Sequence, residues 1–396
     1  MSLIGWDLDT SLAEIATKVH GGERLNAPDG VALSRSLDIL TLGSLANEVR
    51  ERLNGKRTYY VINRHINYTN VCINRCPLCA FSCDETDAAA YVLPIDQMAS
   101  QAARAAAEGA TEIHVVGGLH PRLPFSYYVD MLRAMRDAAP SAHLQAFTAV
   151  EIAHFATISG KSVGRVLEEL RQAGLGSLPG GGAEVFSERV RREICPRKLA
   201  GREWLEVMRQ AHLLGLKSNA TMLYGHVESI EERVDHLLRL RDLQDETGGF
   251  LSFIPLKFHP ENTGLAHVVP AGGVEDLKMY AVSRLLLDNF QHVKAFWIML
   301  GVKLAQVAQW FGADDLDGTV IEEKITHAAG ATTPQSLTVS DLRALIKETG
   351  REAVERNTLY EMIDRNLPPK KAGLKPCATP ILSDCRDGGS NRSADL

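Results

Sequence analysis

Two kinds of hydrophobic pattern alternate along most of this chain. Short apolar runs rich in β-branched and aromatic residues predict strands, and longer stretches with apolar residues three and four positions apart predict helices. The expected strands are residues 59–69, 111–118, 143–150, 175–180, 217–223, 250–256, 292–300 and 317–321. The expected helices between them include 94–109, 125–138, 162–174, 202–215 and 228–246.

Eight strand–helix units in succession predict an α/β fold, a (β/α)8 barrel of the TIM type spanning residues 58–366. Residues 1–57 hold two amphipathic stretches, 9–22 and 42–56, which predict a helical extension before the barrel. Residues 367–396 lose this periodicity and gain Pro, Gly and Ser, which is typical of an irregular, poorly ordered tail. An open, doubly wound sheet is the alternative, because alternation alone does not establish closure.

Composition narrows the class of protein. Of the 396 residues, 45% are hydrophobic and 23% are charged, which is ordinary for a folded globular chain. A formal net charge of −6 without a dense basic stretch disfavours nucleic-acid binding. The chain has no apolar run near the roughly 20 residues of a membrane span, and its start lacks the features of a secretion signal. We therefore expect a cytoplasmic protein that binds neither nucleic acid nor membrane.

Four of the seven cysteines crowd one short segment, as Cys72, Cys76, Cys79 and Cys83. The segment follows the first expected barrel strand, so it should lie at the mouth where barrel enzymes place their active sites. A zinc knot normally needs a second pair of ligands, which the chain lacks, and a reducing compartment disfavours a disulfide. The C-x3-C-x2-C spacing favours a [4Fe–4S] cluster on Cys72, Cys76 and Cys79 with one iron open.

Cys83 leaves a second interpretation open. As a fourth ligand it would close the cluster, which is typical of an electron carrier rather than an enzyme. We consider this arrangement less favoured than a bystander cysteine. The remaining thiols carry no predicted chemistry: Cys195 is expected to be structural, and Cys377 and Cys385 to be incidental thiols of the tail.

A C-x3-C-x2-C loop at the start of a βα barrel resembles the signature of the radical S-adenosylmethionine (SAM) superfamily. The resemblance implies that the open iron binds the methionine part of SAM and that an electron from the cluster cleaves SAM to methionine and a 5′-deoxyadenosyl radical. One position departs from the pattern: Leu78 stands before the third cysteine, where the superfamily usually has an aromatic residue.

Further stretches are similar to the superfamily's SAM-binding segments. Gly117 and Gly118 occupy the place of its "GGE" loop, with Leu119 in place of the acidic residue. "TMLYGHVE", residues 221–228, resembles its "GxIxGxxE" stretch, and "FLSFIPL" the strand whose edge reads adenine. For each, an ordinary turn, helix cap or buried strand is the alternative. The SAM-binding residues that the resemblance implies are Phe81, Gly117, Gly118, Glu151, Glu184, Tyr224, Gly225, Phe253 and Ile254.

Longer stretches between residues 64 and 263 resemble the aminofutalosine synthase family of menaquinone biosynthesis. They include "RHINYTNVC", "EIHVVGGLHPRLPFSYYVDMLR" and "LPGGGAEVFSERVRREICPRKL". The resemblance implies a transferase that adds the adenosyl radical to 3-[(1-carboxyvinyl)oxy]benzoate, with SAM as co-substrate and flavodoxin or ferredoxin as electron donor. Dehypoxanthine futalosine cyclase and the deazaflavin-forming enzymes are close alternatives, and an iron–sulfur electron carrier or redox sensor is an alternative from another class.

A dianionic substrate calls for cations or amide donors at the barrel mouth. Arg64 lies near an expected strand end, and four histidines fall at or just beyond such ends, where a barrel aims side chains inward. The predicted catalytic or substrate-binding residues are His65, His120, Arg122, His226, Lys257 and His259.

Overall fold

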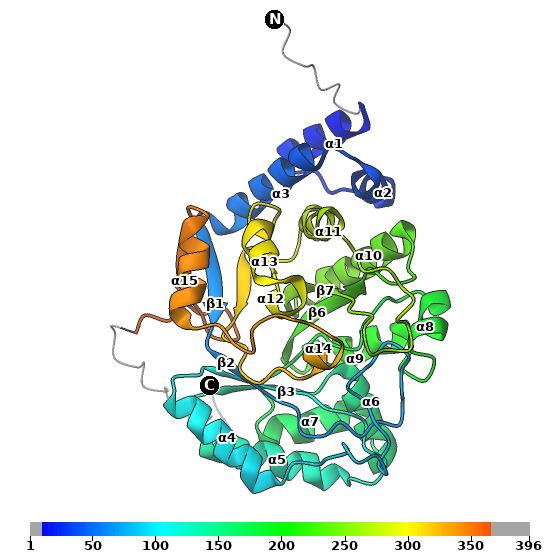
Figure 1. The fold of residues 1–396 in the computed structure, drawn as a ribbon, viewed down its shortest axis with the longest axis vertical. Coiled ribbons are helices and arrows are strands. Elements are labelled where there is room, and N and C mark those ends of the chain that lie inside the picture. Colours follow the sequence, from blue (N-terminus) through cyan, green and yellow to red (C-terminus); the bar gives the residue numbers. More distant parts are fainter. Residues whose placement is uncertain (1–9, 366–396) are drawn as a thin grey trace, which may run out of the picture. The chain divides into compact units, whose positions relative to one another are not determined.

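The computed structural model describes residues 10–365. The predicted tail, with Cys377 and Cys385, lies outside the described residues. Three helices come first: α1 (Thr10–Gly21), α2 (Ala27–Arg35) and α3 (Ile39–Asn54). Asn26 caps α2 by accepting a hydrogen bond from the Asp29 backbone N–H, and the Asp29 carboxylate accepts one from the Asn26 backbone in return. Helices α2 and α3 pack against α10 (Ile230–Thr247) and α11 (Gly273–Leu286) (Figure 1).

Seven parallel strands form the main sheet in sequence order. They are β2 (Asn63–Ile66), β3 (Glu112–Val115), β4 (His143–Ala146), β5 (Ser177–Leu178), β6 (Lys217–Tyr224), β7 (Phe250–Lys257) and β8 (His292–Val293). Helices connect neighbouring strands, as parallel pairing requires. These are α4 (Ile95–Ala107), α5 (Phe125–Ala138), α6 (Ala149–Ser159), α7 (Val163–Ala173), α8 (Glu188–Ile194) and α9 (Gly201–Leu213), besides α10 and α11.

The two edges of this sheet meet through β9 (Asp315–Gly318) and the residues after it, up to Glu322. We call residues 315–322 the closing segment. On one side the Ala295 N–H donates to the Asp315 carbonyl at 2.7 Å. On the other side the His65 N–H donates to the Ile321 carbonyl at 2.9 Å. Because one segment is bonded to both β8 and β2, the sheet closes, and the predicted barrel is confirmed rather than an open sheet.

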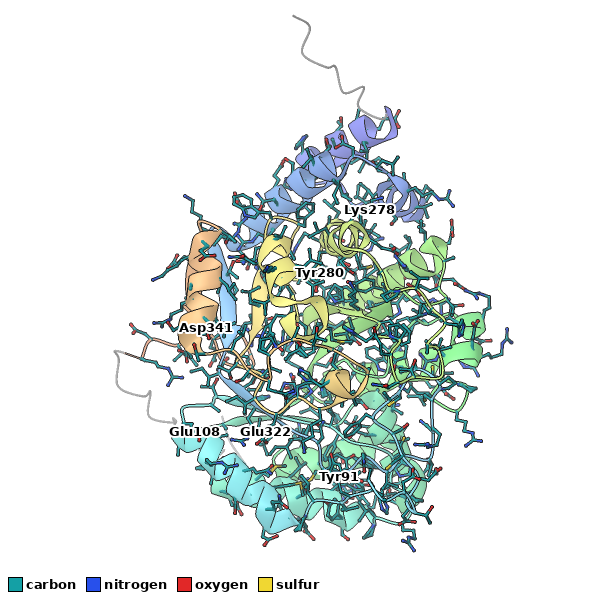
Figure 2. The ribbon with its side chains drawn as sticks, viewed as in Figure 1. Tyr91, Glu108, Lys278, Tyr280, Glu322 and Asp341 are labelled. Atoms are coloured by element: carbon teal, nitrogen blue, oxygen red, sulfur yellow. The ribbon has the colours of Figure 1, made fainter. Side chains whose placement is uncertain are left out.

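Side-chain contacts reinforce the closure. Arg64 of β2 binds Glu322, in the loop after β9, at 2.5 Å, and it contacts Glu108 after α4 at 3.8 Å. The two glutamates lie close together in Figure 2. Arg64 therefore joins the first barrel strand to the closing segment from the outer face, not from the mouth.

The expected strand 59–69 is two strands in the structure. β1 (Arg57–Val61) leaves the barrel and forms a separate three-stranded parallel sheet with β9 and β10 (Glu352–Glu355). The barrel strand β2 begins after Ile62. The sequence pattern did not predict β10 or the helix before it, α15 (Val339–Glu348).

The expected strand 292–300 is also shorter than predicted. Only His292–Val293 is strand, and Trp297–Leu300 forms α12, which is followed by α13 (Val302–Ala308) and, after β9, by α14 (Ile325–Ala328). Trp297 is buried and donates its indole N–H to the Gly318 carbonyl at 2.9 Å. Because of this contact, the end of the apolar run 292–300 forms a helix that packs on the closing segment. No helix among residues 10–365 has the length and apolar character to cross a bilayer.

Candidate active site

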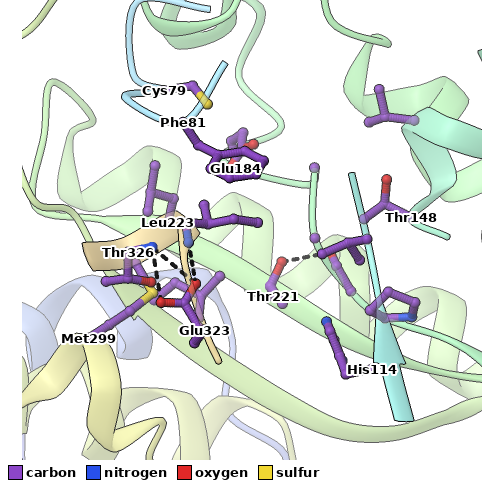
Figure 3. Close-up of a pocket in the computed structure, with 18 of the residues that line it drawn as sticks. Cys79, Phe81, His114, Thr148, Glu184, Thr221, Leu223, Met299, Glu323 and Thr326 are labelled. Carbon is purple, nitrogen blue, oxygen red and sulfur yellow. Dashed lines mark hydrogen bonds between the residues drawn. The ribbon is translucent and has the colours of Figure 1, made fainter. Parts of the chain in front are cut away.

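A cavity of about 340 Å³ lies inside the barrel and extends to the loops beyond its strands. Two groups of lining residues differ in chemistry, and we name them by position. The mouth comprises Cys72, Cys76, Cys79, Phe81 and Glu184, which lie in loops beyond the carboxyl ends of the strands. The floor comprises His65, Glu112, His114, Lys294 and Asp317, which lie on the strands or directly after them. Figure 3 draws Cys79, Phe81 and Glu184 together and His114 at a distance from them.

The cysteine loop brings three free thiols to the mouth. Cys76 is buried, whereas Cys72 and Cys79 are partly exposed to the cavity. Cys83 is not among the lining residues, because its backbone pairs with the loop: its N–H donates to Asn70 and its carbonyl accepts from Cys72. The loop therefore presents three cysteines and turns the fourth away.

These thiols fit a [4Fe–4S] cluster better than a single ion. In the described part of the chain, no three His, Cys, Asp or Glu side chains converge closely enough to ligate one metal ion. Each thiolate of a [4Fe–4S] cluster binds a different iron, so its ligands need not converge on one point. Burial raises the pKa of Cys76 to about 12, and the nearby Lys198 ammonium opposes that rise.

The predicted glycine pair packs against the cysteine loop. A Cβ on Gly118 would lie 2.2 Å from the Val71 carbonyl oxygen, and one on Gly117 would lie 2.7 Å from the ring of Tyr68. Only glycine permits the two loops to approach this closely. The close approach supplies a packing reason for the pair, and both residues still line the cavity.

Glu151 holds this turn in place. One carboxylate oxygen accepts from the Gly117 N–H at 3.1 Å and from the Tyr68 hydroxyl at 2.7 Å. The other accepts from the backbone and hydroxyl of Thr148, which Glu151 pairs with in a capping box at the start of α6. Burial raises the pKa of Glu151 to about 7. Both carboxylate oxygens of Glu151 accept hydrogen bonds from protein groups. The residue therefore fixes the glycine turn relative to α6.

Glu184 forms a buried ion pair at the mouth. Its carboxylate lies 2.5 Å from the Lys198 ammonium, and both side chains line the cavity. Burial opposes ionisation of Glu184, but Lys198 and Arg191 outweigh it and lower the pKa of the carboxyl. Glu184 adopts a left-handed backbone conformation, with φ of 47°, which is uncommon for a residue with a side chain and is found at functional sites.

The floor is a network of polar side chains on the inner faces of the strands. His65 and His114 stack with ring centroids 4.5 Å apart. His114 Nδ1 lies 3.2 Å from Gln145 Oε1, which also accepts from Asn219. Lys294 donates to Asp317 at 2.9 Å. His65 Nε2 is buried, and no described residue forms a hydrogen bond with it.

Burial dominates the protonation of the floor imidazoles. It lowers the pKa of His65 well below the ordinary value, and His114 and Lys294 add to this effect. Burial also lowers the pKa of His114, against the opposing field of Glu112. Both rings are therefore neutral at neutral pH. Burial opposes ionisation of Glu112, but Lys294 and Arg356 outweigh it and lower its pKa.

The structure places eleven of the predicted site residues on the cavity: Cys72, Cys76, Cys79, Phe81, Gly117, Gly118, Glu151, Glu184, Ile254, His65 and His259. His259 Nε2 lies 2.8 Å from the Met299 carbonyl. Seven others do not line the cavity: Phe253, Tyr224, Gly225, His226, Lys257, His120 and Arg122. Strand alternation explains part of the division, since Ile254 faces inward and its neighbour Phe253 packs in the core around the barrel.

The cations outside the cavity have partners elsewhere. Lys257 binds Asp276 at 2.7 Å, and Tyr224 donates to the same carboxylate. Arg122 is 75% exposed and pairs with Glu85. These partners lie on other segments of the chain, 19 residues away for Lys257 and 37 for Arg122, so no local pattern predicted them.

His120, His226 and Gly225 are held by their own loops. His120 Nδ1 accepts from the Arg122 backbone N–H at 3.1 Å. His226 Nε2 lies 3.0 Å from the Leu223 carbonyl, and its Nδ1 lies 2.8 Å from Glu228. The Gly225 N–H donates to the same Glu228.

Several lining residues were not predicted, among them His114, Glu112, Lys198, Lys294 and Asp317. The first two could have been found, because Glu112 and His114 alternate with the apolar Ile113 and Val115 in one strand. That alternation places polar residues on the inner face. Lys198 had no such signal, since it lies in a loop.

Comparison with known proteins identifies the family. The family model described as "Radical SAM superfamily" matches residues 66–240, and the one described as "CofH/MqnC C-terminal region" matches residues 247–369. The aminodeoxyfutalosine synthase of Thermus thermophilus is 46% identical over 90% of this chain and 96% of its own length. The one of Streptomyces coelicolor is 48% identical over 88% and 93%.

Two other relatives mark the breadth of the likeness. The 5-amino-6-(D-ribitylamino)uracil–L-tyrosine 4-hydroxyphenyl transferase of Methanopyrus kandleri is 41% identical over 84% of this chain and 91% of its own. Among solved structures, methylornithine synthase superposes with a TM-score of 0.69 at 17% identity, over 86% of this chain and 97% of its own, which shows a shared fold. The chain therefore belongs to the radical SAM superfamily, in the family of the aminodeoxyfutalosine synthases, and it shares the superfamily's use of a [4Fe–4S] cluster and SAM.

Proposed function

We propose that this protein transfers the 5′-deoxyadenosyl group of SAM to 3-[(1-carboxyvinyl)oxy]benzoate and forms 6-amino-6-deoxyfutalosine for menaquinone biosynthesis. Methionine is released, and the carboxylate of the enol ether leaves as CO2 or bicarbonate. The observation that carries the proposal is identity of 46–48% to two aminodeoxyfutalosine synthases over about nine tenths of the chain. A flavodoxin or ferredoxin would supply the electron.

Cys72, Cys76 and Cys79 would hold the cluster, because they are the cysteines that line the cavity from one loop. When bound and reduced, the cluster supplies the electron that cleaves SAM to methionine and a 5′-deoxyadenosyl radical. Gly117, Gly118 and Glu184 line the same cavity and would contact SAM. Glu151 fixes the glycine turn.

The cavity walls serve a reactive radical by excluding water. Between mouth and floor the lining includes the apolar side chains of Val116, Leu223, Ile254, Phe296 and Met299. A primary radical must meet its acceptor carbon at about 3–3.5 Å before solvent or protein does. These apolar side chains would hold the two substrates against each other and limit the water between them.

The test is turnover by the anaerobically reconstituted holoenzyme with dithionite, SAM and the enol-ether benzoate. We expect 6-amino-6-deoxyfutalosine and methionine in equal amounts by mass spectrometry. Formation of 5′-deoxyadenosine without the adduct would contradict the proposal. A cluster whose reduced EPR signal is unchanged by SAM would favour the electron-carrier alternative.

A second candidate is transfer of the 4-hydroxyphenyl group of tyrosine to 5-amino-6-(D-ribitylamino)uracil, the reaction in the name of the Methanopyrus relative. Identity of 41% over 84% of the chain favours it, although less than the synthases are favoured. The same holoenzyme supplied with tyrosine and the uracil distinguishes the two, because each reaction gives a product of different mass.

A further inference from the structure

The floor contains a buried polar group that the protein itself does not use. Among residues 10–365, His65 Nε2 has no hydrogen-bond partner, and the residue is only 7% exposed. An imidazole nitrogen left unpaired in a buried site is destabilising. The ring lines the cavity and is held flat against His114, which is itself fixed by Gln145. Within the described part of the chain, His65 therefore has a ring held by stacking and an Nε2 without a hydrogen-bond partner.

Lys294 supplies a second set of donors at the floor. An ammonium group has three N–H bonds, and Asp317 is the acceptor found for one of them. Asp317 is held in a left-handed backbone conformation, with φ of 63°, in a closing segment where Val320 and Glu322 also have positive φ. Such strain persists where the surrounding structure imposes it, and it clusters at ligand sites.

The floor carboxylates are already partnered. Asp317 pairs with Lys294, and Glu112 accepts from Asn63 at 3.4 Å. Both carboxylates stay in the lining, and the donors left there for an incoming group are His65 and the N–H bonds of Lys294 that Asp317 does not accept. These donors suit an acceptor with two oxygens, which a carboxylate is.

The geometry of the proposed reaction decides which carboxylate reaches the floor. The carbon that accepts the adenosyl group must lie near the mouth, where the cysteine loop is. The carboxylate of the enol ether is attached next to that carbon. The ring carboxylate is at the far end of the substrate, so it extends toward the floor.

We propose that His65 and Lys294 bind the ring carboxylate of the benzoate substrate, with His114 as a positioning residue that fixes the plane of His65. This inference rests on the proposed function, since the ligand is that reaction's substrate. It assigns the recognition of the aryl carboxylate, which the product retains, to the floor rather than to the cations near the mouth.

Two half-ligands test the assignment by calorimetry on the reconstituted holoenzyme. 3-Methoxybenzoate keeps the ring carboxylate, and 2-phenoxyacrylate keeps the enol-ether carboxylate. His65→Phe retains an aromatic ring for the stack on His114 but removes the nitrogens. We expect this variant to lower the affinity for 3-methoxybenzoate about tenfold or more. Its affinity for 2-phenoxyacrylate should stay within about twofold of the wild-type value.

Further variants separate binding from folding. His65→Gln keeps an amide N–H and should recover most of the affinity for 3-methoxybenzoate. The pair Lys294→Met with Asp317→Asn removes the ammonium without leaving a buried carboxylate, and Asn tolerates the left-handed φ at position 317. It should weaken 3-methoxybenzoate as His65→Phe does. His267→Phe changes an exposed histidine outside the cavity and should leave both ligands unaffected.

Equal weakening of both half-ligands by His65→Phe, or no binding of 3-methoxybenzoate to the wild-type protein, overturns the inference. So does unchanged binding in both floor variants. The result is independent of turnover. If the holoenzyme makes no adduct but 3-methoxybenzoate binding depends on His65, the proposed function fails and the aryl-carboxylate site stands. If the adduct forms while His65→Phe keeps its affinity and KM, the function stands and the site fails.

Discussion

The mouth and the floor of the cavity belong to one barrel but are built in opposite ways. At the mouth, Cys72, Cys76 and Cys79 come from a single loop, and their spacing is visible in the sequence. At the floor, His65, His114 and Lys294 come from three regions of the chain, and each lies at a strand's inner face or just past its end. The cysteines of the mouth form a local motif, whereas the floor exists only when the barrel closes.

This contrast indicates which region carries the shared chemistry and which recognises the substrate. A loop motif can be shared by enzymes with many substrates, because it carries the chemistry of the cluster and SAM. Residues on the strands deep in the barrel can vary between such enzymes and so can recognise different substrates. Which of them are neighbours is set by strand pairing. The predictions below separate these two regions, in order of decreasing effect.

The largest effect should come from removing a thiol at the mouth. Cys76→Ala should abolish the visible absorption of the reconstituted cluster and all measurable adduct formation, because a cluster ligand is lost. Cys83→Ala is the matched control and should keep both, since Cys83 does not line the cavity. Loss of the cluster in Cys83→Ala would show that the fourth cysteine is a ligand.

At the floor, Lys294→Met alone should lower the free energy of unfolding by about 3–5 kcal/mol, because it leaves the buried Asp317 carboxylate without its partner. Urea unfolding measures the change. Lys161→Met breaks a half-exposed pair with Glu169 and should cost no more than about 1 kcal/mol. Equal costs for the two variants would mean that the floor pair is solvated.

Glu151 gives the mouth a pH dependence. Burial raises its pKa to about 7, whereas an unfolded chain has a Glu pKa of about 4.3. The folded form therefore holds the proton more tightly, and this group's contribution to stability is lost as pH rises from about 4.3 to about 7. Glu151→Gln removes that loss. The free energy of unfolding of the variant should therefore rise by about 3 kcal/mol relative to that of the wild type as pH increases from about 5 to 8.

Urea unfolding of both proteins at several pH values measures this difference. The absolute stability of the variant is not the readout, because the amide also alters the hydrogen bonds to Gly117 and Thr148. A constant difference between the two proteins across this range would mean that Glu151 is ionised throughout.

The smallest expected effect is at the glycine turn. Gly118→Ala should lower the free energy of unfolding by about 1–3 kcal/mol, because its Cβ would lie 2.2 Å from the Val71 carbonyl oxygen. Gly164→Ala is the control. It lies in α7 with its nearest neighbour at 3.7 Å, and it should gain about 0.5–1 kcal/mol from lower chain entropy. Equal changes in the free energy of unfolding for the two variants would show that close packing does not require glycine at position 118.

Much of the barrel could be predicted from the sequence. The strand over 250–256 is β7 (Phe250–Lys257), and the helix over 125–138 is α5 with the same bounds. The errors occur where one apolar run serves two sheets or turns a corner. Residues 59–69 divide at Ile62 because β1 pairs with β9 and β10, and residues 297–300 become a helix because Trp297 packs on Gly318.

The candidate site was predicted unevenly for the same reason. Side chains predicted from a motif within one loop, such as Cys72 and Gly118, line the cavity. Cations predicted from their nearness to strand ends, such as Lys257 and Arg122, turn to carboxylates that the sequence could not place beside them. Nearness to a strand end fixes the backbone position but not the direction of a long side chain.

The cysteine spacing, the order of strands and helices, and the family resemblance could be read without a fold, because they depend on residues close together in the chain. The fold was needed to show that Cys83 does not line the cavity, that Glu151 accepts hydrogen bonds from Tyr68 and Gly117, and that His65, His114 and Lys294 share a floor. Those facts depend on which strands become neighbours when the barrel closes between β8 and β2. Closure depends on backbone pairing between segments far apart in the chain, and a pattern of nearby residues does not predict such pairing.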